Sequence, residues 1–112
     1  MALLPCPYLG GEVELTAERE AHIRLRHPTL LPQHLDLVAE TIRDPDEVRR
    51  AMLTEAQLMF VREFETLGAE PQLVVVVLED EPRSDIEQGQ FWVVTAYRSD
   101  YEYVAGRLVW ER

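Results

Sequence analysis

Residues 73–78 read Leu-Val-Val-Val-Val-Leu, an aliphatic run without a polar side chain. A run this short and this rich in β-branched residues is typical of a central strand that is buried on both faces of a sheet. Gln57–Phe64 before it and Phe91–Tyr97 after it alternate in side-chain character, which predicts two flanking strands. Residues 66–71 predict a hairpin connection, and residues 79–89 a polar loop.

The N-terminal half has helical periodicity instead. Thr16 is a favourable N-cap for a helix over Ala17–Arg26, which ends before Pro28 because the residue preceding a proline avoids helical conformation. Pro32 lies near the first turn of a second helix, which ends at Asp44-Pro45 and has an apolar stripe at spacings of four, three and four: Leu31, Leu35, Val38 and Ile42. A last short helical turn is expected over Pro45–Arg50.

These elements predict one α+β domain over residues 1–112, with two or three N-terminal helices packed on one face of a C-terminal antiparallel sheet of three to five strands. Residues 1–11 are expected to form an irregular arm. Glu12–Leu15 fits a short strand or an extended lead-in, and Tyr101–Trp110 a fourth strand broken by Gly106. Helices cover only one side of such a sheet, which leaves a cleft, an interface or plain surface on the other.

The composition limits the classes of function. The chain has 11 basic residues, all arginine, and 21 acidic residues, so its formal net charge is −10. This excess of acid disfavours nucleic-acid binding by general phosphate neutralisation and anchoring to an anionic membrane. The N-terminal residues lack the features of a targeting segment and no run is apolar enough to span a bilayer, so we expect a cytoplasmic location and no membrane partner. Cys6 is the single cysteine, which excludes an intrachain disulfide.

The sequence lacks the common metal and nucleotide motifs. Its three histidines, His22, His27 and His34, do not have the i,i+4 spacing of a helical zinc pair. It contains neither a glycine-rich phosphate loop nor a GxSxG elbow. We therefore expect no metal and no cofactor.

Four polar residues could meet on one surface and act without a metal. His27 ends the first predicted helix, and Arg62 is the only charge on the apolar face of its predicted strand. Thr95 and Tyr97 share a strand face because they are two residues apart. An imidazole can transfer a proton near pH 7, a guanidinium can neutralise a phosphorane, and hydroxyl groups can donate to its non-bridging oxygens. These are the parts of metal-independent RNA cleavage.

Each residue also has a structural interpretation. His27 can simply favour the negative end of the helix dipole. Arg62 can extend past its apolar neighbours and pair with Glu63 or a loop acid. Thr95 and Tyr97 are ordinary strand formers.

The order of the sequence words resembles the phage-type barnase–EndoU–colicin–RelE-like (BECR) nuclease family over residues 12–110. The words are Val13-Glu-Leu-Thr16, His22-Ile23, Arg26-His27-Pro28, Glu40 to Val48, Phe60-Val-Arg62, Leu73 to Val77 and Val93-Val-Thr95-Ala96-Tyr97. The resemblance implies a small α+β fold, a cleft on the open sheet face, and a toxin-like ribonuclease activity that needs no metal.

Carried over position by position, the resemblance implies His27, Arg62, Thr95 and Tyr97 as catalytic residues. It adds His22 as a helix residue, and we take His22 and Arg98 as substrate-binding. The substrate would be RNA, attacked by its own 2′-hydroxyl to give a cyclic phosphate. An acidic protein can do this if a few arginines confine the positive potential to the cleft.

A second hypothesis is a catalytically degenerate acidic module of the same fold, which acts through protein–protein contact. Its partner would be a second copy of the chain, as a homodimer, or an antitoxin-like protein. Tyr and Trp are favoured at interface centres, and the chain has aromatic residues around its last predicted strands: Phe91, Trp92, Tyr101, Tyr103 and Trp110. The sequence leaves both hypotheses open.

Overall fold

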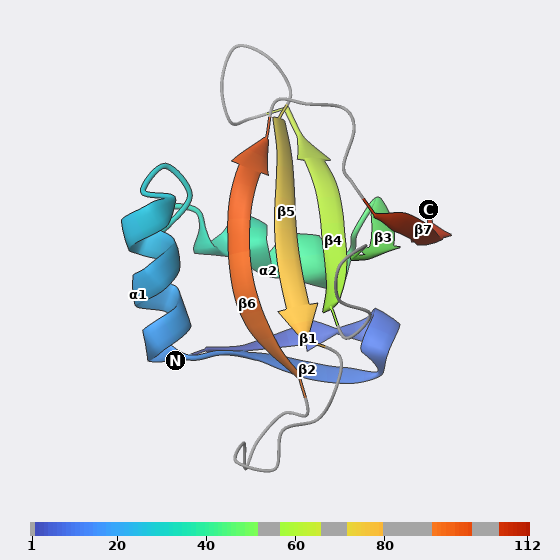
Figure 1. The fold of residues 1–112 in the computed structure, drawn as a ribbon, viewed down its shortest axis with the longest axis horizontal. Coiled ribbons are helices and arrows are strands. Elements are labelled where there is room, and N and C mark those ends of the chain that lie inside the picture. The colour runs from blue at the N-terminus through green and yellow to red at the C-terminus, as the bar shows by residue number, and fades with distance from the viewer. Residues whose placement is uncertain (1, 52–56, 66–71, 80–90, 100–105) are drawn as a thin grey trace.

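The computed structural model describes residues 2–51, 57–65, 72–79, 91–99 and 106–112. These residues form a seven-stranded mixed sheet, two α-helices and a short 3-10 turn (Figure 1). The helices are α1 (Ala17–Arg26) and α2 (Leu35–Arg43), and the 3-10 turn is η1 (Pro7–Leu9). The strands are β1 (Ala2–Cys6), β2 (Gly11–Leu15), β3 (Glu47–Arg50), β4 (Gln57–Phe64), β5 (Gln72–Glu79), β6 (Phe91–Ser99) and β7 (Arg107–Glu111).

The strand order is β1-β2-β6-β5-β4-β3-β7, with β5 in the middle. Neighbouring strands are antiparallel except β2 and β6, which pair in parallel over a short stretch. The valines of β5 are buried on both faces, as the aliphatic run predicts. Its ladders with β4 and β6 therefore fix which residues of those two strands share a face.

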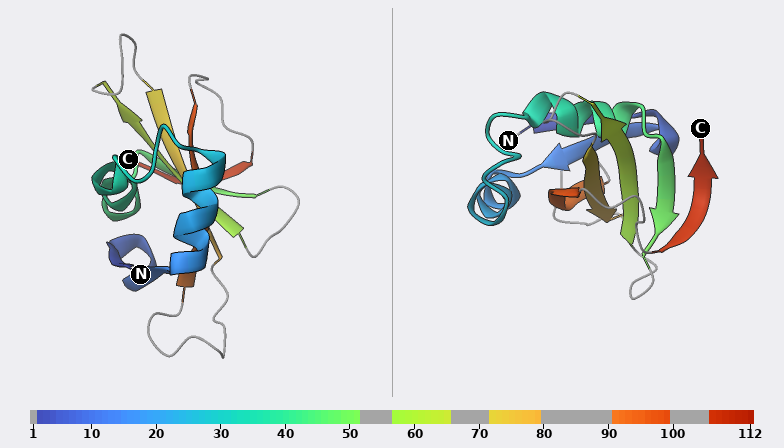
Figure 2. Two further views of the ribbon diagram at one scale, coloured as in Figure 1. Left: turned by 90° about the vertical axis from the view of Figure 1, so that its left-hand side faces the viewer. Right: turned by 90° about the horizontal axis from the view of Figure 1, so that it is seen from above.

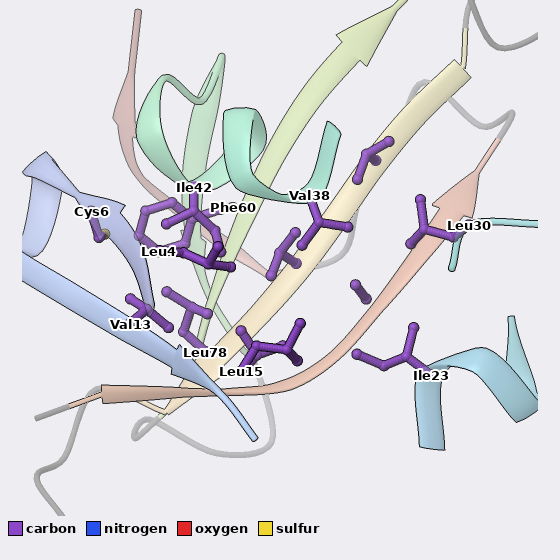
Figure 3. Packing of buried hydrophobic residues seen from close by; sticks show 14 of the residues in the cluster. Leu4, Cys6, Val13, Leu15, Ile23, Leu30, Val38, Ile42, Phe60 and Leu78 are labelled. Carbon is purple, nitrogen blue, oxygen red and sulfur yellow. The ribbon is translucent and has the colours of Figure 1, made fainter. Parts of the chain in front are cut away.

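The main core lies between the sheet, α2 and the β1–β2 hairpin. Figure 2 shows α2 and the hairpin on the same side of the central strands. Figure 3 shows hairpin and helix side chains pointing toward Phe60 and Leu78 of the sheet. At the tip of the hairpin, the Tyr8 ring meets the ring of Phe60 edge-on at 5.7 Å and that of Trp110 at 6.2 Å. The hairpin thus crosses the covered face and reaches the far edge of the sheet.

Helix α1 follows its sequence signals closely. Its bounds are those predicted, and the Thr16 hydroxyl accepts a hydrogen bond from the backbone N–H of Arg19 (3.1 Å), as an N-cap should. The helix packs beside β6 (Figure 1), where β2 pairs with only the first residues of that strand. Ile23 is its buried anchor, and His27 is its C-cap.

The predicted fold class is wrong in its proportions. We expected two or three helices on an antiparallel sheet of three to five strands, whereas the described residues form seven strands, one pairing of them parallel, and only two short helices. The strands that were not predicted are β1 and β3 in the N-terminal half. Each is held by pairing with a partner distant in sequence or by a hairpin, which local periodicity does not reveal.

The N-terminal arm over residues 1–11 is also wrong. Residues 2–6 form β1, in which Leu4 and Cys6 point into the core while Leu3 and Pro5 are exposed. A proline is tolerated there because β1 is an edge strand. Glu12–Leu15 forms a strand, as its alternation predicts, and that strand extends back to Gly11.

The helical turn expected over Pro45–Arg50 is a strand instead. Glu47–Arg50 forms β3, with Val48 buried and the side chains of Glu47 and Arg49 joined on one face by a 2.8 Å ion pair. Residues two apart meet in this way on a strand and not on a helix. The final strand, β7, overlaps the end of the predicted range and pairs with β3 rather than with β6.

Some predictions lie outside the described residues. They are the hairpin over 66–71, nearly all of the polar loop over 79–89, and residues 101–105. Glu79, the first residue of that predicted loop, belongs to β5, and β6 continues two residues beyond Tyr97. Within the described part of the chain, neither helix has the length and apolar character needed to cross a bilayer.

Removal of a core side chain should show how much this packing contributes to the free energy of unfolding. Leu78 in β5 is fully buried, whereas Leu25 on α1 is 81% exposed. We expect Leu78→Ala to lower the free energy of unfolding by about 2–5 kcal/mol because it removes buried methyl groups and leaves a cavity. The matched change Leu25→Ala should alter it by less than about 0.5 kcal/mol. Urea denaturation of both variants measures the difference, and equal effects would contradict the burial described here.

Candidate functional site

The predicted site residues divide between the two faces of the sheet. In the ladders of β5, Arg62 and Arg98 both lie in register with Val74, and Tyr97 lies in register with Val75. Adjacent strand residues point to opposite faces. Arg62 and Arg98 therefore project toward the face that α2 covers, and Tyr97 projects toward the other, which we call the open face.

His27 joins Tyr97. The two ring centroids are 6.0 Å apart with an interplanar angle of 39°. The imidazole is positioned by the end of α1, where the His27 backbone N–H donates to the carbonyl oxygen of Ile23 (2.7 Å). Residues 70 positions apart in sequence thus form one small polar pair beside the edge of β6.

The surroundings set the protonation of this pair. Burial lowers the pKa of His27 below its ordinary value, and the nearby charges of His22 and Arg26 lower it further. Burial raises the pKa of Tyr97. At neutral pH the imidazole is therefore uncharged and able to accept a proton, while the phenol keeps its proton and can donate a hydrogen bond.

Two more predicted residues belong to this neighbourhood. Thr95 pairs with Val77 and lies on the same face as Tyr97, two residues along β6. His22 is half-buried on α1, close enough for its charge to act on His27. Of the six predicted residues, the structure gathers His27, Tyr97, Thr95 and His22 around the meeting point of α1 and β6.

Arg62 does not join them. Its guanidinium faces α2, where Nη1 contacts the Asp44 carboxylate at 3.0 Å and donates to the Asp44 backbone oxygen at 2.6 Å. Nη2 lies 3.4 Å from the Glu40 carboxylate. The guanidinium also lies 5.5 Å from the centre of the Phe64 ring, two residues along the same strand. The anion that a lone charge on an apolar face requires comes from the protein itself.

The acids around Arg62 hold the end of α2 to the sheet. Asp44, the C-cap of α2, also pairs with Arg112 Nη2 at 2.6 Å. Asp46 accepts a hydrogen bond from the backbone N–H of Glu63 (2.8 Å). Arg62, Asp44 and Arg112 thus connect α2, β4 and the residue after β7, which is a structural role.

Arg98 has its own polar surroundings on the covered face. Its guanidinium donates to the side-chain oxygen of Gln72 (Nε at 2.8 Å and Nη2 at 2.5 Å) and to the backbone oxygen of Thr29 (3.2 Å). With Ser99 these residues line a surface pocket of about 270 Å³. Arg98 therefore follows Tyr97 in sequence, but its side chain lies on the opposite face of the sheet.

Arg26 was not predicted as a site residue. It lies in the last turn of α1, directly before His27, and is exposed. The signal in the sequence was the Arg26-His27-Pro28 word. It places a cation next to a potential base, where an anionic substrate could bind. The acids of α2 that neutralise Arg62 could not be found from local patterns, since they act across the fold.

Within the described residues, no group of three or more His, Cys, Asp and Glu side chains is arranged to hold a metal ion. Comparisons with protein-family models, curated proteins and solved structures found no match to this chain. The function is therefore argued from the residues themselves.

The Arg62–Asp44 contact should make stability depend on pH. The hydrogen bond from Arg62 is the main reason that the pKa of Asp44 is lowered, with the charge of Arg112 adding to it. A carboxyl group with a lowered pKa stabilises the fold above its unfolded pKa, about 3.9, and loses that contribution as the pH falls through the folded value.

We therefore expect Asp44→Asn to be less stable than the wild type at pH 7, with a difference that shrinks steadily below about pH 4. Urea denaturation over this pH range measures it. Glu65→Gln, a change at an exposed acid, is the control. A difference between wild type and Asp44→Asn that stayed constant down to pH 2 would contradict the assignment.

Proposed function

We propose that this protein is a metal-independent ribonuclease whose active centre is the His27–Tyr97 pair on the open face of the sheet. The observation that carries the proposal is the contact of the two rings at 6.0 Å, together with opposite pKa shifts that favour a neutral imidazole and a protonated phenol. The resemblance of the sequence to the BECR nucleases supports the same reaction.

The reaction would begin with proton transfer to His27. As the 2′-oxygen of the RNA forms a bond to the neighbouring phosphorus, its proton passes to the imidazole. The bond from phosphorus to the 5′-oxygen then breaks, and that oxygen takes up a proton from water. The products are a 2′,3′-cyclic phosphate end and a 5′-hydroxyl end.

The negative charge that develops on the phosphate needs donors and a cation. The Tyr97 hydroxyl would donate to a non-bridging oxygen, and Thr95 on the same face would be a second donor. Arg26 would supply the positive charge in place of Arg62, which is neutralised by acids of α2. Arg24 and Arg26 also offset the partial negative charge at the C-terminal end of α1, which would otherwise repel a phosphate.

The direct test is incubation of the purified protein with end-labelled RNA in the presence of EDTA. We expect cleavage that leaves cyclic phosphate ends, and a loss of roughly 10²–10⁴-fold in rate for His27→Ala because a proton-transfer group is removed. Tyr97→Phe, which keeps the ring, should lose about 10²–10³-fold. His34→Ala is the matched control and should retain full activity. Undiminished cleavage by His27→Ala would overturn the role of His27.

The pH profile provides an independent test. Because burial, with the charges of His22 and Arg26 adding to it, lowers the pKa of His27, the acid limb of kcat/KM should lie below the ordinary histidine value of about 6.5. Arg26→Gln should move that limb to higher pH, since the charge that disfavours the imidazolium is gone. A limb that does not move would assign the titration to another group.

A second function is favoured by the pairing of Arg62. With that guanidinium held by Glu40 and Asp44 and a net charge of −10, the fold is also suited to a non-catalytic module that acts by protein contact. Absence of any RNA cleavage by the folded wild-type protein would favour this second function over the first.

A further inference from the structure

The outer face of α1 carries an apolar groove of about 460 Å³. Ile23 is the buried anchor of the helix, and successive helix residues turn by about 100°. Ala21 and Leu25, two residues to either side of Ile23, therefore lie on the opposite side of α1, away from the sheet. Leu25 is 81% exposed, more than any other large hydrophobic residue that the structure describes. The groove is lined by Ala21, Arg24, Leu25, Pro28, Leu31 and Pro32.

The groove begins at the residue that follows His27. Pro28 forms part of its wall, and Leu31 forms another part. The backbone N–H groups of Leu30 (3.0 Å) and Leu31 (3.3 Å) both donate to the carbonyl oxygen of His27. Leu30 and Leu31 are also buried, so packing holds this turn in place. A ligand that extends from His27 around the end of α1 would therefore enter the groove.

The charge of this segment is opposite in sign to that of the whole chain. The chain has 21 acidic residues, but none lies between Glu20 and Asp36, which is its longest acid-free interval. Arg24 and Arg26 lie in this interval, and both are exposed. Arg24 forms no ion pair with any residue that the structure describes, in contrast to Arg62. The segment is thus a place where an anionic ligand meets cations without neighbouring acids in the sequence.

We propose that this groove binds a nucleotide that flanks the cleaved bond, and that the substrate is single-stranded RNA. The choice of RNA as the ligand rests on the function proposed above. One nucleotide supplies both groups that the groove can bind. Its base has a flat face that can pack on the apolar side chains of Leu25 and Pro28, and its phosphate can accept hydrogen bonds from the Arg24 guanidinium.

Base pairing would prevent this contact. In an A-form duplex the faces of the bases are stacked on one another, and only their edges reach the grooves. A base can pack on Leu25 only after it has left the stack, as unpaired bases do when they pack on protein side chains. A protein segment with one acidic and one apolar side chain has the same two kinds of group. The continuity of the groove with His27 favours the RNA.

Binding of an RNA analogue that cannot be cleaved tests the groove separately from catalysis. Fluorescence anisotropy with labelled 2′-O-methyl octauridylate is suitable, because its blocked 2′-oxygen cannot attack the phosphate. We expect Leu25→Ala to weaken binding by roughly three- to tenfold, with an unchanged dependence on salt. Arg24→Gln should weaken binding and also lower the slope of log K against log salt concentration by about 0.7, because one phosphate contact is lost.

Each variant has a matched control. Leu108→Ala makes the same change as Leu25→Ala at an exposed leucine of β7, and Arg43→Gln removes the same charge as Arg24→Gln from an exposed position on α2. Both controls should bind the octanucleotide as the wild type does. In competition, unlabelled single-stranded RNA should displace the probe more effectively than a stable RNA duplex.

Three results would overturn the inference. They are no binding at about 100 µM wild-type protein, binding that Leu25→Ala and Arg24→Gln leave unchanged, and a duplex that competes as well as the single strand. The second result would leave the groove as a site for a protein segment. These results are distinct from a failure of the proposed function. RNA cleavage by a protein whose groove variants bind normally supports the His27–Tyr97 site alone, whereas groove-dependent binding without cleavage supports the groove alone.

Discussion

Strand β5 is paired along its whole length with β4 on one side and from Leu73 to Glu79 with β6 on the other, and its valines are buried on both faces. This double burial is the constraint from which the arrangement of polar residues follows. A slip of one residue in either ladder would turn every side chain of the slipped strand to the opposite face. Because both faces of β5 are apolar, the burial of its neighbours must select the register. Phe60 and Leu58 of β4 and Ala96 of β6 do so by facing the main core.

The register separates two sets of charges that a reading of single strands would combine. Arg62 and Arg98 are turned toward the covered face. There the C-terminal end of α2 supplies oxygen atoms to Arg62, and the loop after α1 supplies one to Arg98. Tyr97 is turned toward the open face, where, among the residues that the structure describes, the end of α1 brings a titratable partner, His27, into ring contact. Acids of the protein itself thus neutralise Arg62 on the covered face. On the open face, a histidine with a lowered pKa lies beside a protonated phenol. This division favours the α1–β6 meeting point over Arg62 as the centre of any reaction.

The sequence predicts the features that depend on neighbouring residues. The Thr16 cap, the bounds of α1, the buried run of β5 and the shared face of Thr95 and Tyr97 all follow from local spacing. The features that depend on distant partners are not predicted. The residues of β3 have the local pattern of a helical turn, but they form a strand because they pair with β4 and β7. The residues of β1 have the pattern of an irregular arm, but they form a strand because they pair with β2. The parallel pairing of β2 with β6 joins residues almost 80 positions apart, and nothing in the local pattern of either strand indicates it.

Arg62 shows which part of an ion pair can be predicted from the sequence and which part cannot. A guanidinium on an apolar strand face needs an anion, because an unpaired charge at a core boundary is costly. The sequence therefore predicts an anion beside Arg62, and the ribonuclease hypothesis predicts that this anion is a phosphate. In the structure, Asp44 and Glu40 meet it from a helix whose packing on β4 could not be inferred from spacing. The source of the anion therefore depends on tertiary structure even when the need for one is evident in the sequence. By the same argument, Arg26 is the better cation for a substrate, since it lies exposed on the last turn of α1, next to the histidine that would accept the proton.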